Sequence, residues 1–265
     1  MLKLHTRRTF LKRGIESVAG LTMAGNLASG ALSVNGQPSR NGNSSLEDIE
    51  PDAFCFSRLR YTTIEPTRKP WNHLPEYDDA FLKFLKKVTN VKVSEKSFNE
   101  RVIGIEDLHR IFFETNSRSK IFLHPFLFMT GQSRFVLSRK QGAALGEYIK
   151  RGGFLWADDC VDRNMSPFSH CVIRQIDKIL PNTRMERVPP SHEIYHCFYD
   201  IPDGSPYCWG ERLGDHGLFY DNRLAIFLTP NDVHCGMARD APRFIPYREA
   251  CLKIAANVVI YALTH

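Results

Sequence analysis

The sequence predicts an α/β fold of three layers, with a mostly parallel sheet between two layers of helices. Two observations predict it. Short apolar runs bounded by turn residues alternate with segments of helical period along most of the chain. The run at 121–129 is also strongly apolar, as in a central strand, despite Pro125. Strands that alternate with helices are typical of the α/β class.

The expected elements follow in chain order. Strands or extended pieces are predicted at 54–61, 102–105, 121–129, 154–157, 183–188 and 224–229. Helices are predicted at 77–88, 138–150, 167–180 and 247–263. Local signals mark three helix starts: carboxylates at the first, Ser138 as the cap of the second, and Pro167 in the first turn of the third.

The chain opens with basic residues followed by an apolar stretch, and residues 1–33 are interpreted as a twin-arginine signal peptide. Arg7 and Arg8 precede Phe10 and Leu11, which matches the pattern that a receptor reads as an export address. The twin-arginine translocase is therefore an expected partner, and the expected location is periplasmic or otherwise extracytoplasmic.

A membrane anchor is the alternative for this segment. Glycines and Asn26 interrupt the apolar stretch at 15–32, whereas a span needs about 20 predominantly apolar residues, so we expect no stable span in the mature form. Residues 34–52 are rich in Asn, Ser, Gly and charge, which is typical of a flexible linker. Residues 53–265 are then expected to form one domain.

The net charge gives little support for nucleic-acid binding. Five of the 35 basic residues and one of the 29 acidic residues lie in the signal segment, which leaves 30 basic against 28 acidic residues and a net charge of +2. Because nucleic-acid binding needs a clustered basic face, we expect no such partner. The chain also lacks a phosphate-binding glycine loop and a Gly-x-Ser-x-Gly motif, so a nucleotide enzyme is not expected.

The seven cysteines are scattered without the close paired spacing of a zinc site. Most are expected to be small buried hydrophobic residues, and Cys197 with Cys208 is the one pair considered for a disulfide in an oxidising compartment. Cys160 stands between a strand and a helix, as some nucleophiles do. The adjacent acidic residues Asp158 and Asp159 would suppress its thiolate, so it is expected to be a poor nucleophile.

Two carboxylates follow the strand predicted at 154–157. Neighbouring residues of an extended chain point to opposite sides, so either Asp158 or Asp159 is expected to face a cleft. The other would cap the next helix or bind backbone amides. The alternative is that both only organise the turn.

Two more loops carry polar candidates. His192 and His196 follow a pair of prolines; a structural or hydrogen-bonded pair is favoured over a metal site, because the prolines disfavour a helix. Asp232 follows the strand at 224–229 and is expected to face the same cleft as Asp158, at the carboxyl edge of the sheet, with His192 over the same edge. A simple turn is the alternative for Asp232.

Separated segments carry a family resemblance: 54–61, Trp71, 152–159, 191–195 and 257–264. In this order they resemble the bacterial domain-of-unknown-function 4159 (DUF4159) family, across essentially the whole mature chain. The resemblance implies a flavodoxin-like sheet of the class I glutamine-amidotransferase-like type, related to proteins of the trehalose-utilisation type. It implies no established activity, and such relatives characteristically lack the amidotransferase cysteine and histidine machinery.

A non-catalytic or degenerate ligand-binding domain is the expected function, with a carbohydrate or another envelope-associated polar molecule as ligand. The carbohydrate class rests on the family resemblance. The candidate ligand-binding residues are Asp158, Asp159, His192, Asp232, Trp71 and Tyr195. Further aromatic faces could come from Trp156, Tyr199, Tyr207 and Trp209.

Two alternatives stay open. One is a metal-assisted hydrolase in which Asp158, His192 and Asp232 hold a divalent ion that activates water. The other is an interaction or scaffold protein of the cell envelope, to which the linker at 34–52 would give reach. The sequence itself requires no cofactor.

Replacing Arg7 and Arg8 together by lysine tests the export signal. We expect the full-length precursor to stay inside the cell, because planar guanidinium groups and ammonium groups are not equivalent in recognition. Immunoblots of cell fractions and the activity of a fused reporter measure this. Normal processing of the double variant, with reporter activity outside the cytoplasm, would refute the assignment.

Overall fold

The computed structural model describes residues 53–66, 70–114, 124–160, 165–180, 182–208 and 211–265. The expected signal peptide and linker lie outside these ranges, as does Trp209. Within them, no helix is both long enough and apolar enough to cross a membrane.

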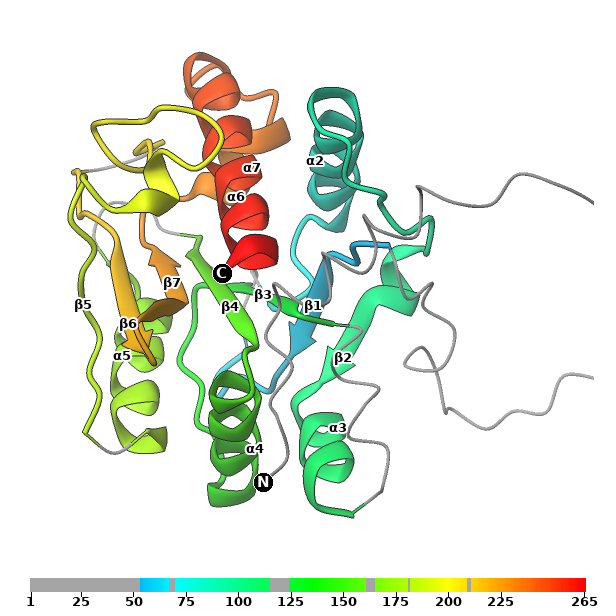
Figure 1. Ribbon diagram of the computed structural model, residues 1–265, viewed down its shortest axis with the longest axis vertical. Helices are drawn as coiled ribbons and strands as arrows, with labels where there is room; N and C mark the ends of the chain where they lie inside the picture. Colours follow the sequence, from blue (N-terminus) through cyan, green and yellow to red (C-terminus); the bar gives the residue numbers. More distant parts are fainter. Residues whose placement is uncertain (1–52, 67–69, 115–123, 161–164, 181, 209–210) are drawn as a thin grey trace, which may run out of the picture.

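One sheet of seven strands runs through the domain in the order β2-β1-β3-β4-β7-β6-β5 (Figure 1). The strands are β1 (Ser57–Arg60), β2 (Val102–Gly104), β3 (Phe126–Gly131), β4 (Phe154–Asp159), β5 (Glu186–Arg187), β6 (His216–Tyr220) and β7 (Arg223–Thr229). The first five strands of that order are parallel, and β6 pairs antiparallel with both β7 and β5. The parallel part has the flavodoxin-like order, in which the chain direction along the sheet reverses between β1 and β3.

Helices cover both faces of the sheet (Figure 1). One layer consists of α2 (Pro75–Val88), α6 (Val233–Ala238) and α7 (Arg248–Thr264), and the other of α3 (Ile105–His109), α4 (Arg139–Lys150) and α5 (Pro167–Ile179). Short turns of other helix types are η1 (Phe98–Arg101), η2 (Arg110–Glu114), η4 (Glu193–Tyr195) and η5 (Ile245–Tyr247). The predicted three-layer α/β fold is therefore confirmed.

Most predicted elements are present, with shifted ends. Ser138 caps α4 by accepting a hydrogen bond from the Gln141 amide, as expected. Strand β3 begins only after Pro125, since proline has no N–H to give to the sheet. Three elements were missed. Strand β6 is only partly buried and starts at a His-Gly pair, and α3 and α6 are five and six residues long, so none of the three has a strong periodic pattern.

Side chains of the central strands alternate between two apolar cores. On β3, Phe126 and Phe128 pack towards α2, α6 and α7, whereas Leu127 and Met129 pack on the other face. Strand β4 follows the same rule. Because successive strand residues point to opposite faces, this register also decides where the carboxylates at the end of β4 go.

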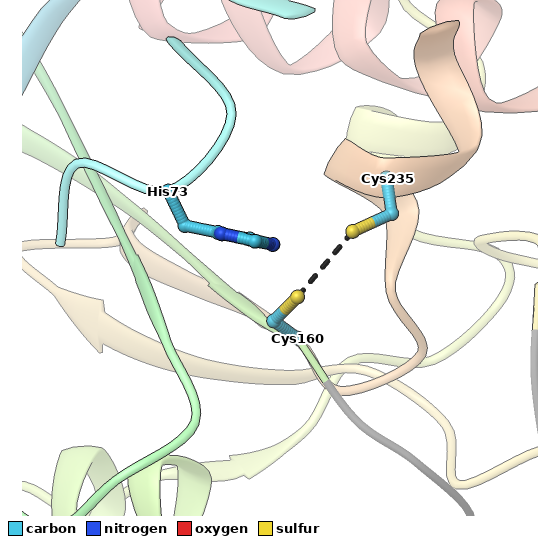
Figure 2. Close-up of side chains that lie close together, drawn as sticks. All are labelled: His73, Cys160 and Cys235. Atoms are coloured by element: carbon cyan, nitrogen blue, oxygen red, sulfur yellow. Dashed lines mark hydrogen bonds between the residues drawn. The ribbon is translucent and has the colours of Figure 1, made fainter. Parts of the chain in front are cut away.

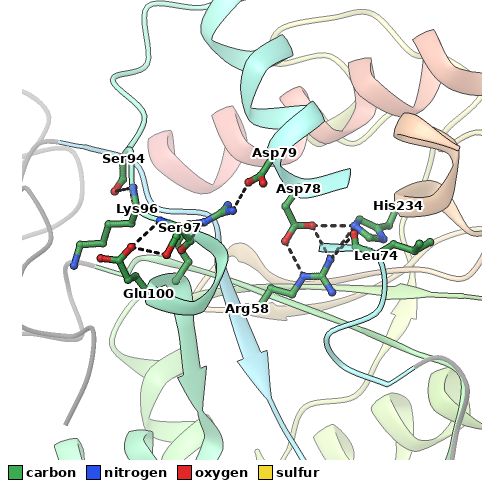
Figure 3. Close-up of polar contacts among 10 residues, drawn as sticks. Arg58, Leu74, Asp78, Asp79, Ser94, Lys96, Ser97, Glu100 and His234 are labelled. Atoms are coloured by element: carbon green, nitrogen blue, oxygen red, sulfur yellow. Dashed lines mark hydrogen bonds and ion pairs between the residues drawn. The ribbon is translucent and has the colours of Figure 1, made fainter. Parts of the chain in front are cut away.

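A buried ion pair joins the first strand to the first helix. Arg58 on β1 forms a bidentate pair with Asp78 on α2, with Nε–Oδ2 and Nη2–Oδ1 distances of 2.8 and 2.7 Å (Figure 3). His234 Nε2 lies 2.9 Å from Asp78 Oδ1 and 3.0 Å from Arg58 Nη2. Burial opposes the charge on Asp78, but Arg58 and His234 together hold the pKa of this carboxyl below its ordinary value.

The same arginine holds the chain segment before α2. Its Nη1 donates to the carbonyl oxygens of Trp71 and His73, at 2.8 and 3.0 Å. Arg58, a residue of β1, thus fixes two carbonyl groups of the segment between β1 and α2. Charge-assisted bonds of this kind are about twice as strong as bonds between neutral groups.

We expect Arg58→Met to lower the free energy of unfolding by about 3–5 kcal/mol, because it leaves a buried carboxylate without its cation. The matched control is Arg60→Met on the same strand. Arg60 is 52% exposed and lies 3.9 Å from Asp107, so its loss should cost less than about 1 kcal/mol. Urea unfolding measures both, and equal losses in the two variants would contradict the prediction.

Candidate functional site

Loops from three strands meet at the carboxyl edge of the sheet. His73 lies in the segment after β1, Cys160 directly follows Asp158 and Asp159 at the end of β4, and the segment from Asp232 to Cys235 follows β7. The β4 and β7 strands are neighbours in register, with Asp158 opposite Thr229. Ligands of open α/β sheets bind beyond this edge.

Asp158 points to the α6 side of the sheet and holds the start of that helix. Its carboxylate accepts hydrogen bonds from the Thr229 hydroxyl at 2.5 Å and from the amides of Val233 and His234 at 3.2 and 3.0 Å. Burial raises the pKa of Asp158 well above its ordinary value, and the nearby Asp232 adds to the rise. The side chain is fully buried, so it organises the β7–α6 turn.

Asp159 points to the opposite face, as the alternation predicts, and holds the start of α5. It accepts hydrogen bonds from the Ser166 amide at 2.9 Å, from the Ser166 hydroxyl at 2.5 Å and from the Ser169 hydroxyl. Burial raises its pKa to about 6, against the lowering effect of these serine donors. The cap of α5 is Ser166, whose hydroxyl accepts from the Phe168 amide at 3.1 Å, and Asp159 binds this cap. Both carboxylates thus accept from backbone amides, which is the other role expected for one of them.

Asp232 lies at the same edge, in the left-handed conformation at φ 64° and ψ 38°. Its amide donates to the Asp159 carbonyl, and its own carbonyl accepts from the Gly236 amide, both at 3.1 Å. Aspartate is one of the few residues besides glycine that adopts this conformation readily. The structure thus brings Asp158, Asp159 and Asp232 together around one turn.

His192 does not join the carboxylates. Its ring packs against Phe219 and Tyr261, and the Tyr261 hydroxyl accepts from the amide of Leu224, near the start of β7. That is the opposite edge of the sheet, so the expected cleft shared by Asp158, His192 and Asp232 is not formed. The cause is η4, whose buried Ile194 seats this loop against α7.

His196 makes its own contacts, with Nδ1 2.5 Å from Asp200 Oδ1 and Nε2 2.8 Å from the Pro190 carbonyl oxygen. The two imidazoles of the loop therefore have separate partners. Burial lowers the pKa of His192. The separate partners of His192 and His196 agree with a structural role for both histidines, and they give no support to a metal site between them.

The aromatic candidates divide by burial. Trp156 donates from Nε1 to the Thr229 hydroxyl at 2.9 Å, and the Tyr195 hydroxyl donates to Asp215 at 2.6 Å. Both rings are enclosed in the core and present no face to a ligand. Trp71 is partly exposed and stacks on Phe98 with ring centroids 6.2 Å apart.

A cluster of one imidazole and two thiols lies at the carboxyl edge. The ligating atoms of His73, Cys160 and Cys235 all lie within 4.8 Å of one another, and the two sulfur atoms are 3.3 Å apart. The three side chains come from the β1–α2 loop, the end of β4 and α6, and they point toward one another (Figure 2). Both cysteines are buried, and His73 is half-buried.

Sequence reasoning missed His73 as a site residue. The available signal was its position two residues after Trp71, in the loop that follows the first strand. Cys160 and Cys235 each stand directly in a segment singled out from the sequence, but nothing local shows that they meet. Their contact depends on β4 and β7 being neighbours.

The remaining cysteines correct the proposed disulfide. Cys208 Sγ lies 3.1 Å from Cys251 Sγ, whereas the Cys197 thiol donates to the Asn257 carbonyl at 3.3 Å. Cys197 and Cys208 are therefore not a pair, and none of the seven cysteines, all of which the structure describes, forms a disulfide. Burial raises the pKa of Cys197 to about 11.

A family profile described as "Domain of unknown function (DUF4159)" matches residues 55–263. That range contains every helix and strand described above, apart from Thr264, the last residue of α7. A search of curated proteins gives no match.

The raised pKa of Asp159 makes a test by pH possible. The folded protein favours the protonated carboxyl, so this group stabilises the fold at low pH and loses that contribution as the pH rises from 3.8 to about 6. We expect wild type to lose on the order of 2–3 kcal/mol of stability relative to Asp159→Asn between pH 4 and pH 7. Urea unfolding of both proteins across this range measures the difference.

The matched control is Asp240→Asn, which removes a carboxylate that is 92% exposed. Taking the difference between wild type and each variant cancels the titrating groups that do not interact with the replaced carboxylate. If this difference in unfolding free energy changed with pH equally for both variants, burial of Asp159 would not be the cause of the change.

Proposed function

The chain belongs to the DUF4159 family, and from this premise we propose that its domain binds a small polar ligand at the carboxyl edge of the sheet without chemical turnover. The observation that carries the proposal is the convergence of three loops there, with His73 beside Cys160 and Cys235. Loops placed by a rigid scaffold are where binding residues concentrate.

The β1–α2 loop supports a polar ligand. Trp71 and His73 are partly exposed and Asn72 between them is exposed, so one short segment offers an aromatic face, an amide and an imidazole. Such a mixture of apolar surface and a few polar groups is typical of small-molecule sites. Arg58 fixes the carbonyls of this segment from within the sheet, which reduces the ordering cost of binding. Carbohydrates are the ligand class that we propose first.

The state of two carboxylates supports binding over hydrolysis. Asp158 and Asp159 are fully buried and accept hydrogen bonds from amides and hydroxyls of the turns that they organise. A hydrolytic metal or a general base would need such a group within reach of the substrate. With His192 at the other edge, the expected hydrolase trio has no geometric support.

We also propose that the domain acts outside the cytoplasm, after export by the twin-arginine translocase. Arg7, Arg8 and the apolar stretch that follows support this. The parallel strand order β2-β1-β3-β4-β7 is compatible with a relationship to class I glutamine amidotransferases. That relationship would be by fold, and it carries no activity with it.

Thermal melting with glucose, trehalose and N-acetylglucosamine tests the proposal. The protein is first dialysed against EDTA, so that bound ions do not contribute. We expect at least one sugar to raise the melting temperature, since a ligand at 100 times its dissociation constant adds about 2.7 kcal/mol to stability. For Asn72→Ala and His73→Ala, the sugar concentration needed for the same rise in melting temperature should be at least tenfold higher.

His170→Ala is the matched control, because His170 is an exposed histidine on α5; it should bind sugar as wild type does. The same proteins are incubated with nitrophenyl esters, phosphates and glycosides. Turnover that His73→Ala abolishes would contradict a binding role. Absence of any sugar-induced shift would exclude carbohydrate as the ligand class.

A further inference from the structure

We infer that His73, Cys160 and Cys235 bind one thiophilic metal ion, and that Zn²⁺ suits these donors best. This inference rests on the proposed function, because it names a ligand for the same edge of the sheet. It differs from the hydrolase considered from the sequence, since it uses none of Asp158, His192 and Asp232.

The spacing of the donors fits a tetrahedral ion. With zinc–sulfur bonds of 2.3 Å, two thiolates on one tetrahedral Zn²⁺ stand about 3.8 Å apart. The two sulfur atoms here are 3.3 Å apart, and all three ligating atoms lie within 4.8 Å of one another. Shifts of well under 1 Å in side-chain position would therefore bring Cys160, Cys235 and His73 to bonding distance.

The donor types select the metal. Two thiols and one imidazole are soft ligands, which favour Zn²⁺ or Cu⁺ over Mg²⁺ and Ca²⁺. Deprotonation of Cys160 and Cys235 on binding would release two protons and supply two negative charges. These charges balance Zn²⁺, so the buried cluster would be neutral overall. A neutral cluster avoids the large cost of burying an uncompensated charge.

Each donor is held by a separate element of the fold. The Cys160 amide donates to the Gly131 carbonyl at 3.0 Å, which continues the β3–β4 ladder to this residue. Cys235 lies in the first turn of α6, which Asp158 fixes through two amides. The His73 carbonyl is bound by Arg58. Donors on well-supported elements bind metals with less loss of conformational freedom.

Three protein donors leave one position of a tetrahedral ion open. Both cysteines are buried and His73 is half-buried, with its Nε2 atom buried. Three protein ligands with a fourth position for water or another molecule is the arrangement of an open zinc site. Asn72, which directly precedes His73 in the sequence, is exposed.

Titration of the EDTA-treated full chain with Zn²⁺ and with Co²⁺ tests the site. We expect one ion per chain, and for Co²⁺ the charge-transfer absorption of thiolate ligands in the near ultraviolet. Cys160→Ser and His73→Ala should each weaken binding by more than about 100-fold, since loss of a hydrogen-bonding group behind a ligand already costs 10–100-fold. Cys171→Ser, which changes a buried thiol of α5, should bind as wild type does.

Circular dichroism checks that each variant folds, and His73→Ala keeps the test valid if a buried cysteine variant does not fold. Equal binding by wild type and His73→Ala, or no thiolate band with Co²⁺, would overturn the metal site. Loss of metal binding with sugar binding retained would leave the proposed function standing. Zinc binding with turnover of an ester or phosphate would support the metal site and contradict the non-catalytic role.

Discussion

The buried guanidinium of Arg58 is the interaction on which the arrangement over the carboxyl edge depends. Removing such a cation from water costs several kcal/mol, and here every guanidinium nitrogen finds an acceptor among Asp78 and the carbonyls of the β1–α2 loop. Lysine could not replace it, because an ammonium group lacks the planar fork that meets a carboxylate at two points. One side chain therefore sets the positions of α2, of the loop that carries His73 and of α6. The conformation of the β1–α2 loop therefore depends on a buried residue of the core, Arg58.

The carboxylates at the end of β4 are used in a way that changes the chemistry of the edge. Asp158 and Asp159 point to opposite faces, and each binds the amides at the start of one helix. Carboxyl oxygens at helix starts stabilise the helices by accepting from amides that have no partners within the helix. The acidic groups are thus withdrawn from the surface. The carboxyl edge instead carries two thiols and an imidazole, which favour softer metal ions than carboxylates do.

The sequence predicted the parts of the fold that depend on local pattern. Helices with caps and buried strands carry periodic signals, and the opposite directions of Asp158 and Asp159 follow from strand geometry alone. The site could be predicted only in part, because its members are joined by strand order. Cys160 meets Cys235 only because β7, and not β6, lies beside β4. His192 was misplaced for a related reason: burial of a neighbouring isoleucine against α7, which no local pattern shows, takes its loop to the other edge.

The burial gradient across the cluster links the two proposed ligands. Cys160 and Cys235 are buried beside the half-buried His73, which belongs to the same short segment as Trp71 and the exposed Asn72. An ion on the thiols would therefore fix the imidazole, and with it the loop on which a polar molecule would rest. Any effect of the ion on the affinity for that molecule must be matched by an equal effect of the molecule on the affinity for the ion. The loop is already held from below by Arg58, so little ordering remains for either ligand to supply. Coupling between them would then arise mainly from direct contact at the open coordination position.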